Sequence, residues 1–276
     1  MNPLRSGPAL IGAVILGLLL VAAVTAPLLA PYDPAQPVGP SLASPSGAHP
    51  LGTNNLGQDV ASRLIWGARS TLLAAATAVG LAVSLGVLVG VGAGLAGGWP
   101  DLLAARTIDL ALAVPRLPLL ILIAAFAGVG GPTVAVLIGV LMWPAVARVV
   151  RSQTLTLRQR GYVRAARGFG ASWSQLLRRH LLPGLAPLLI AETIVVASAT
   201  VLLEASLAFL GLADPTRVSW GLDLHRALLE PGVYFSSAWL WWVLPAGALI
   251  TMAILAFTLL GVGVERRWQP RVERVA

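Results

Sequence analysis

The chain has 276 residues, of which 57% are apolar and only 11% are charged, whereas about a quarter is charged in an ordinary soluble domain. This composition excludes a water-soluble globule. The apolar residues come in blocks of about twenty, the length of a membrane-spanning helix, so the sequence predicts an all-α integral membrane protein. All 19 basic residues are arginine, and against 11 acidic residues they give a net charge of +8.

Three features of the composition narrow the function classes further. Without lysine, the chain has no phosphate-binding Walker loop and no Schiff-base lysine. Without cysteine, it has no disulfide, thiolate metal site or cysteine nucleophile. The three histidines, His49, His180 and His225, lack a metal-ligand spacing. We therefore expect no metal site and no cofactor in this chain.

The first expected span is residues 9–30, which follow a single Arg5. Its length of about 22 residues exceeds the 7 to 15 apolar residues of a cleavable signal peptide, so we expect an uncleaved anchor. Residues 31–70 then hold prolines every few positions, together with glycine and serine. Such a stretch cannot continue a helix, and it predicts an extramembrane loop.

The second expected span is residues 71–97, which are rich in alanine, glycine and valine. Small residues favour close helix packing in lipid. Gly92, Gly94 and Gly97 also form a G-x-G-x-x-G pattern, but no strand precedes it and no acidic partner for a ribose follows it. The pattern therefore favours helix packing over a dinucleotide site.

The third span must combine residues 102–114 with a short apolar run that follows, because that run alone cannot cross a bilayer. Pro115 and Pro118 are expected to bend it. Arg106 and Asp109 lie three positions apart on one helical face and can pair near the membrane surface. Three further spans bring the expected total to six: residues 132–150, 183–210 and 239–264.

The arginines divide unequally between the two sides of a six-span topology. Fifteen belong to the set of segments that contains both termini and residues 148–182, and only four to the other set. The positive-inside rule therefore places both termini and this segment in the cytosol, and the Pro-rich loop outside. The expected organisation is a tip and first span (1–30), an external loop (31–70), a five-helix core (71–264) and a cytosolic tail (265–276).

The cytosolic segment 151–182 has helical periodicity in spite of its charge. Its apolar residues recur at steps of three and four, and Arg160, Arg164 and Arg167 form a separate row. Gly168 and Gly170 weaken a helix in the middle, which predicts two short helices that meet at a bend. Such a segment either lies on anionic lipid or docks on a cytosolic partner.

Residues 162–172, YVRAARGFGAS, followed by Leu182 and Pro183, resemble the E-A-A-x-x-x-G signature of ABC importer permeases, in the form used by the dipeptide, oligopeptide and nickel branch. Arg164 replaces the glutamate that gives the signature its name. The resemblance implies that this segment is the coupling helix, which docks on an ATPase. The residues assigned to docking are Tyr162, Val163, Arg164, Ala165, Ala166, Arg167, Gly168, Phe169, Gly170, Ala171, Ser172 and Trp173.

Three further stretches resemble the same family in the expected order. Residues 49–59, HPLGTNNLGQD, are similar to its H-P-L-G-T-D-x-x-G-R-D, with Asn54 and Gln58 as departures. Residues 204–212, EASLAFLGL, with the Ser-Trp-Gly at 219–221, are similar to its E-x-x-L-S-F-L-G-L-G and S-W-G. Residues 255–264, LAFTLLGVGV, are similar to its L-A-F-N-L-L-G-D-G-L. Together with the extra first span, they resemble the second, C-type permease subunit.

The resemblance implies a type I ABC importer permease with six transmembrane helices, which moves peptides or similar small solutes inward without enzymatic chemistry of its own. The implied partners are a homologous second permease subunit, two cytosolic ATP-binding subunits, an external solute-binding protein and the lipid bilayer. No nucleic acid is implied. The implied location is the plasma (inner) membrane of a prokaryote. Two rival functions are a channel that conducts without ATP and a membrane-embedded hydrolase.

A hydrolase would need a nucleophile with a base in reach, and the spans offer Ser84, Ser198 and Ser206 without a histidine or lysine. Glu192 and Glu204 lie inside the fifth span, where an ionised carboxylate must face water or a partner. They are 12 positions apart, about 120° around a helix, so they do not share a stripe. Either can line a translocation cavity or form an interhelical hydrogen bond.

The sequence does not assign a ligand-binding role to the tryptophan cluster or to His180. Trp239, Trp241 and Trp242 stand at the outer end of the sixth span, where an interfacial aromatic belt accounts for them. His180 follows two arginines, so we expect it to be solvated at the surface.

Overall fold

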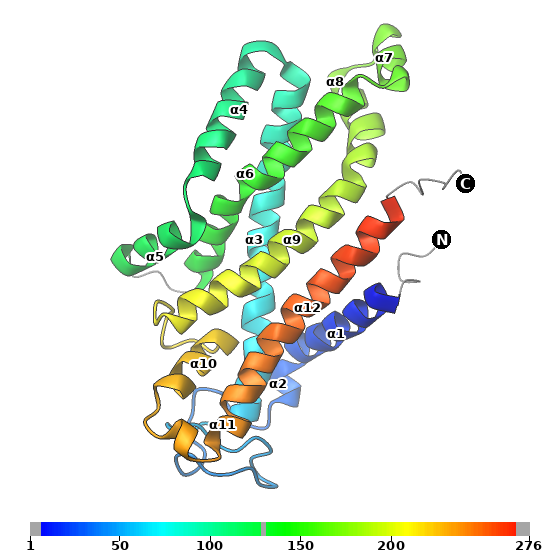
Figure 1. Cartoon of the computed structure of the whole chain (residues 1–276). Coiled ribbons are helices and arrows are strands. Elements are labelled where there is room, and N and C mark those ends of the chain that lie inside the picture. The colour runs from blue at the N-terminus through cyan, green and yellow to red at the C-terminus, as the bar shows by residue number, and fades with distance from the viewer. Residues whose placement is uncertain (1–6, 128–130, 269–276) are drawn as a thin grey trace, which may run out of the picture.

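The computed structural model describes residues 7–127 and 131–268, and every regular element in these ranges is a helix (Figure 1). The all-α prediction is therefore confirmed for the described residues. The elements are α1 (Gly7–Val24), α2 (Ala26–Leu29), α3 (Val60–Ala96), α4 (Gly98–Ala113), α5 (Arg116–Ala127), α6 (Gly131–Arg158), α7 (Gly161–Gly168), α8 (Trp173–Leu176), the π-helical η2 (Leu177–Leu181), α9 (Leu182–Phe209), α10 (Trp220–Leu229), the 3₁₀ turn η3 (Val233–Phe235), α11 (Ala238–Trp241) and α12 (Val243–Trp268).

Five described helical stretches are long and apolar enough to cross a membrane, and the pair α4 and α5 makes a sixth if it counts as one span. That pair is bent by 74°. Val114, at the break, is extended because the ring of Pro115 disfavours the helical region for the residue before it. The expected bend is thus present, and five of the six expected spans are single helical stretches, with α4 and α5 in the place of the third.

The pairing expected inside α4 is wrong. Asp109 accepts a hydrogen bond from Nη2 of Arg148 on α6 at 2.6 Å, instead of pairing with Arg106. One end of α4 is tied to α6 in the same way, because Nε and Nη2 of Arg151 donate to Asp101 at 2.5 and 2.8 Å. The two helices lie against each other, so arginines of α6 reach the acids of α4.

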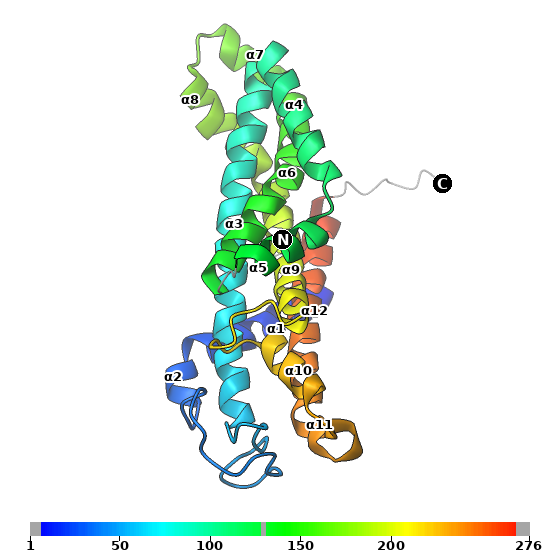
Figure 2. The same ribbon diagram turned by 90° about the vertical axis from the view of Figure 1, so that its left-hand side faces the viewer.

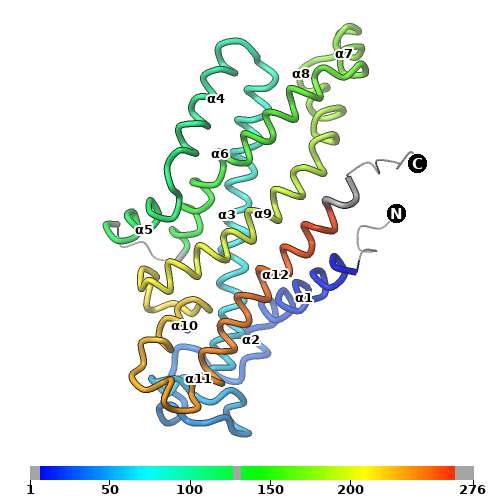
Figure 3. Tube along the Cα trace, viewed as in Figure 1, coloured from blue at the N-terminus to red at the C-terminus, as the bar shows by residue number. Residues whose placement is uncertain are grey.

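The longest helix, α3, begins at Val60 rather than near residue 71, so the non-helical part of the expected 31–70 loop ends at Asp59. The carboxylate of Asp59 caps the helix by accepting from the backbone amide of Ser62. At 1.5 Å per residue, 37 residues extend for about 55 Å, more than the roughly 30 Å of hydrocarbon. The tube drawing shows α3 running through the middle of the molecule (Figure 3).

The most extensive helix contact joins α3 to α6. Gly86, Gly90 and Gly94 recur every fourth residue and lie on the face of α3 that meets α6. A Cβ atom on Gly90 would lie 2.8 Å from the carbonyl oxygen of Ala147. The small residues of this helix therefore let the two backbones approach closely, as expected. Of the G-x-G-x-x-G pattern only Gly94 belongs to this face, because nothing lies within 4 Å of a Cβ atom on Gly92 and Gly97 lies past the end of α3.

Two apolar cores stabilise the bundle. One joins α1, α9, α10 and α12 to the first part of α3, and the other joins α5, α6 and α9 to the middle of α3. Trp241 and Trp242 are only 8% and 0% exposed in the first core, so the aromatic-belt prediction is wrong for them. Trp241 is the last residue of α11 and Trp242 lies at the break before α12, and both rings pack in this core. Trp239 is 38% exposed.

Several of the segments that the arginine count separated lie at opposite ends of the molecule, whereas α5 lies near its middle (Figures 1 and 2). Residues 30–59, α10 and α11 gather at one end, called the cap below. At the opposite end lie α7, α8 and the turn between α3 and α4. α1 and α12 lie side by side, and the start of α1 and the end of α12 both point away from the cap. Which end faces the cytosol remains a prediction.

Candidate functional site

The segment between α6 and α9 folds as two short helices, α7 and α8. They meet at Gly170, whose φ of +83° is disfavoured for residues with a Cβ atom. Ser172 and Gln175 then form a capping box that begins α8. The predicted pair of short helices with a glycine bend is confirmed.

The surface of this segment is aromatic and cationic. Phe169 is 92% exposed, and Tyr162 and Trp173 are each 51% exposed. Val163 and Leu176 are buried and anchor the segment to the bundle. The expected apolar stripe therefore does not pack inward as a whole. Its three aromatic rings remain available for a partner. The row of Arg160, Arg164 and Arg167 is exposed as well.

Side-chain stacking holds the two short helices in place relative to each other and to the start of the next span. The guanidinium of Arg167 lies over the ring of Trp173, 5.0 Å from its centroid. The rings of Tyr162 and His180 are 5.9 Å apart. His180 is half-buried beside Tyr162, so it is only partly solvated and the expectation of a fully solvated side chain is not met.

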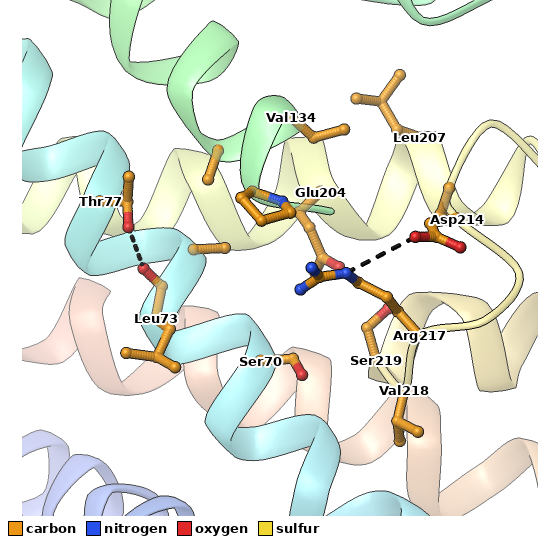
Figure 4. Close-up of a pocket in the computed structure, with 14 residues that line it drawn as sticks. Ser70, Leu73, Thr77, Val134, Glu204, Leu207, Asp214, Arg217, Val218 and Ser219 are labelled. Atoms are coloured by element: carbon orange, nitrogen blue, oxygen red, sulfur yellow. Dashed lines mark hydrogen bonds and ion pairs between the residues drawn. The ribbon is translucent and has the colours of Figure 1, made fainter. Parts of the chain in front are cut away.

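A cavity of about 210 Å³ lies between α3, α6, α9 and the loop that follows α9 (Figure 4). Its lining combines apolar side chains with a few charged and hydroxyl groups. The lining residues are Ser70, Leu73, Ala74, Thr77, Pro132, Val134, Ala135, Glu204, Leu207, Ala213, Asp214, Arg217, Val218 and Ser219.

Glu204 places a half-buried carboxylate in this cavity, five residues before the end of α9. The hydroxyl of Thr71 on α3 donates to its Oε2 at 3.4 Å. Glu204 thus has an interhelical hydrogen bond and lines a cavity at once, the two roles that the sequence left open. Glu192, farther from the end of α9, is half-buried and does not line this cavity. The role of both acids in a pathway remains a prediction.

The loop after α9 forms the charged side of the cavity. Asp214 accepts hydrogen bonds from the backbone amide of Thr216 at 2.9 Å and from its hydroxyl at 2.6 Å. These bonds hold the pKa of Asp214 below its ordinary value. The other carboxylate oxygen lies 3.7 Å from Nε of Arg217, whose side chain is 51% exposed. Both charges belong to this loop, and the sequence analysis missed them because nothing in their spacing marks a site.

A buried polar network in the cap was also missed. Nε of Arg63 on α3 donates to Oδ1 of Asp223 on α10 at 2.6 Å, and both side chains are 2% exposed. Arg63 also donates to Gln58 at 2.7 Å and to the carbonyl of Pro34 at 2.8 Å. Burial raises the pKa of Asp223, and the Arg63 guanidinium opposes that shift. The network ties the Pro-rich loop to α3 and α10.

The H-P-L-G-T stretch contributes to the same cap. Nδ1 of His49 lies 3.1 Å from Oδ1 of Asp59, and its ring stacks on Tyr32 with centroids 5.0 Å apart. No group of three potential ligands that could hold a metal ion occurs within residues 7–127 and 131–268.

Two family models match this chain. Residues 86–274 match the binding-protein-dependent transport system inner membrane component, and residues 4–45 match the N-terminal transmembrane domain of oligopeptide transport permease C. The chain belongs to the inner-membrane permeases of binding-protein-dependent transport systems. It is a membrane-spanning permease subunit of the ABC transporter class, in the dipeptide and oligopeptide branch, and a multi-pass inner-membrane protein.

Curated relatives match this permease over nearly its whole length. It is 37% identical over 272 residues to a protein of Brucella suis biovar 1 (strain 1330) named "Putative peptide permease protein", covering 98% of this chain and 89% of the relative. It is 34% identical over 277 residues to the glutathione transport system permease protein GsiD of Escherichia coli O1:K1 / APEC, covering 98% of this chain and 88% of that protein. The family resemblance found from the motifs is thus confirmed.

Proposed function

We propose that this permease pairs with a homologous second permease subunit, two cytosolic ATP-binding subunits and an external solute-binding protein, and that the assembly imports peptides or similar small solutes. The names of the relatives, a peptide permease and a glutathione permease, support this solute class. The chain contains no lysine for a phosphate-binding loop, which supports ATP binding on separate subunits.

The observation that carries this proposal is the exposed surface of α7 and α8. Phe169, Tyr162 and Trp173 present three aromatic rings at the end of the molecule opposite the cap. Aromatic side chains beside arginine are the usual anchors of a protein interface. We assign residues 162–173 to docking on an ATPase subunit, so that closure of the ATPases on ATP moves α7 and, through η2, the span α9.

The distribution of arginine predicts which end of the permease faces the cytosol. We place both termini and α7–α8 in the cytosol of a prokaryote and the cap outside, because the cytosolic set of segments carries fifteen of the 19 arginines. The Glu204 cavity then lies near the outer end of α9, next to the delivering binding protein. We place Glu204 in the translocation pathway. Glu192 remains a second pathway residue predicted from the sequence.

Neither rival function gains support. In the described residues, the hydroxyl of Ser206 donates to the carbonyl of Leu202 at 2.7 Å, a bond within its own helix that does not activate a nucleophile. A channel would conduct without ATP, whereas members of this family serve binding-protein-dependent transport.

The proposal is tested by reconstituting the full transporter in vesicles with the binding protein outside and ATP inside. ATP-dependent accumulation of a radiolabelled dipeptide, absent with a non-hydrolysable ATP analogue, is the expected result. Passive equilibration that ignores ATP would favour a channel. Hydrolysis of the dipeptide by the permease alone would favour the hydrolase.

A further inference from the structure

The Glu204 carboxylate lacks a cationic partner within the described part of the chain. Its hydrogen-bond partner there is a neutral hydroxyl group, that of Thr71, which donates to Oε2 at 3.4 Å. Among the side chains that the structure describes, within residues 7–126 and 132–264, no basic group lies within 4.0 Å of it. An acid inside a membrane protein usually faces a cation or water. The cavity is the space from which such a cation can reach Glu204.

The cavity also carries a charge of the opposite sign on its loop side. Figure 4 shows the guanidinium of Arg217 extending across the cavity in the direction of Glu204, with a contact to Asp214. That contact is 3.7 Å long and involves a half-exposed arginine, so it is weak and exchangeable. The cavity therefore has one acid without a counterion and one arginine that can take another anionic or carbonyl partner.

Size limits what can occupy this space. A cavity of about 210 Å³ is smaller than the roughly 300–1,000 Å³ of sites that enclose a drug-sized ligand. It is large enough for one terminal residue of a peptide. Leu73, Val134 and Leu207 supply apolar walls for a side chain.

We propose that this cavity binds the amino-terminal residue of the transported solute, with its protonated α-amino group on Glu204 and the following carbonyl or carboxylate facing Arg217. This inference rests on the proposed function, because it concerns the solute that the importer carries. It goes beyond that function by naming a protonated amine as the recognised group. A solute whose amine is acetylated cannot form the ion pair with Glu204, so the carboxylate stays without a cation.

The test compares alanyl-alanine with N-acetyl-alanyl-alanine. Both peptides are titrated, to about 10 mM, into the purified permease–ATPase complex in nanodiscs. The binding protein is left out, so its own selectivity does not affect the measured affinities. We expect the wild type to bind the free amine about tenfold or more tightly than the acetylated peptide. Glu204→Gln is expected to remove this preference, while Glu204→Asp, which keeps the charge, is expected to retain it.

Glu230→Gln is the matched control, because Glu230 lies in the cap outside this cavity and its contact, from Nδ2 of Asn55 at 2.9 Å, can also be accepted by a glutamine oxygen. It is expected to leave the preference unchanged. Equal binding of the two peptides by the wild type, no binding of either, or an unchanged preference in Glu204→Gln would overturn the amine site.

ATP-driven uptake in vesicles, measured in parallel, separates this failure from failure of the proposed function. Uptake that requires ATP, combined with no amine preference in the titration, overturns only the amine site. Lack of ATP-dependent uptake by the wild type overturns the importer function, whatever the titration shows.

Discussion

Arg63 and Asp223 form an ion pair of 2.6 Å between α3 and α10, and both side chains are 2% exposed. The pair is incompletely satisfied within the described residues, because Nη2 of Arg63 and Oδ2 of Asp223 have no hydrogen-bond partner there. Two buried charges of this kind depend strongly on each other, since removal of one leaves the other uncompensated in an apolar setting.

Asp223→Asn is therefore expected to destabilise the permease by about 3–5 kcal/mol. The measurement is the thermal unfolding midpoint of the detergent-solubilised protein, followed by tryptophan fluorescence. Asp109→Asn is the control, because the Asp109 and Arg148 side chains are 53% and 54% exposed, and loss of that pair is expected to cost less than about 1 kcal/mol. The double variant Arg63→Met, Asp223→Leu is expected to regain much of the lost stability. Equal shifts for Asp223→Asn and Asp109→Asn would contradict this prediction.

Gly90 and Gly92 provide a test of the α3–α6 contact within one turn of helix. A Cβ atom on Gly90 meets Ala147 and Val150 at 2.8 and 2.9 Å, whereas nothing lies within 4 Å of one on Gly92. Gly90→Ala is expected to destabilise by about 1–3 kcal/mol through overpacking. Gly92→Ala is expected to be neutral or slightly stabilising, because alanine favours the helix. Both are measured as shifts of the same unfolding midpoint, and a larger loss in Gly92→Ala would show that α3 has another rotation about its axis.

Phe169→Asp is expected to leave membrane insertion intact and to abolish most solute-stimulated ATP hydrolysis, because a carboxylate would replace the most exposed ring of the docking surface. Phe169→Leu, which stays apolar, is expected to retain most of the stimulation. ATPase activity of the assembled complex, with and without loaded binding protein, gives the readout. Wild-type stimulation in Phe169→Asp would favour the interpretation of α7 as a lipid-surface helix.

Gly170→Pro tests the bend of the same segment. Proline fixes φ near −65°, whereas Gly170 has a φ of +83° and its amide donates to the carbonyl of Arg167 at 3.0 Å. The variant is expected to insert normally and to lose coupling between solute and ATP hydrolysis. Unchanged coupling would mean that the angle between α7 and α8 has no part in docking.

Reporter fusions test the topology. Fusions after Ser46 and Asp214 are expected to report the external side, and fusions after Ser152 and Arg271 the cytosol. The reason is that fifteen of the 19 arginines belong to the segments expected in the cytosol. Arg271 lies outside the described residues. A cytosolic signal at Ser46 would invert the cap and contradict the orientation proposed for α7.

The sequence by itself determined the membrane class, the approximate spans, the bend of the third span and the two short helices around Gly170. Each of these depends on residues that are neighbours along the chain. Blocks of apolar residues set the spans, a proline excludes the helical conformation of the residue before it, and a glycine permits positive φ. The family could also be predicted from the sequence, because each motif is defined by the spacing of residues that are close along the chain.

Only the tertiary structure decided which helix faces meet. The Arg63–Asp223 pair joins residues 160 positions apart, and Thr71 reaches Glu204 over 133 positions. Asp109 meets Arg148 rather than its neighbour Arg106, because α4 lies along α6. Trp242 lies at the break before α12 and is buried in the first core. Such contacts depend on the rotation of each helix about its axis and on its packing partner, and periodicity within one helix fixes neither quantity.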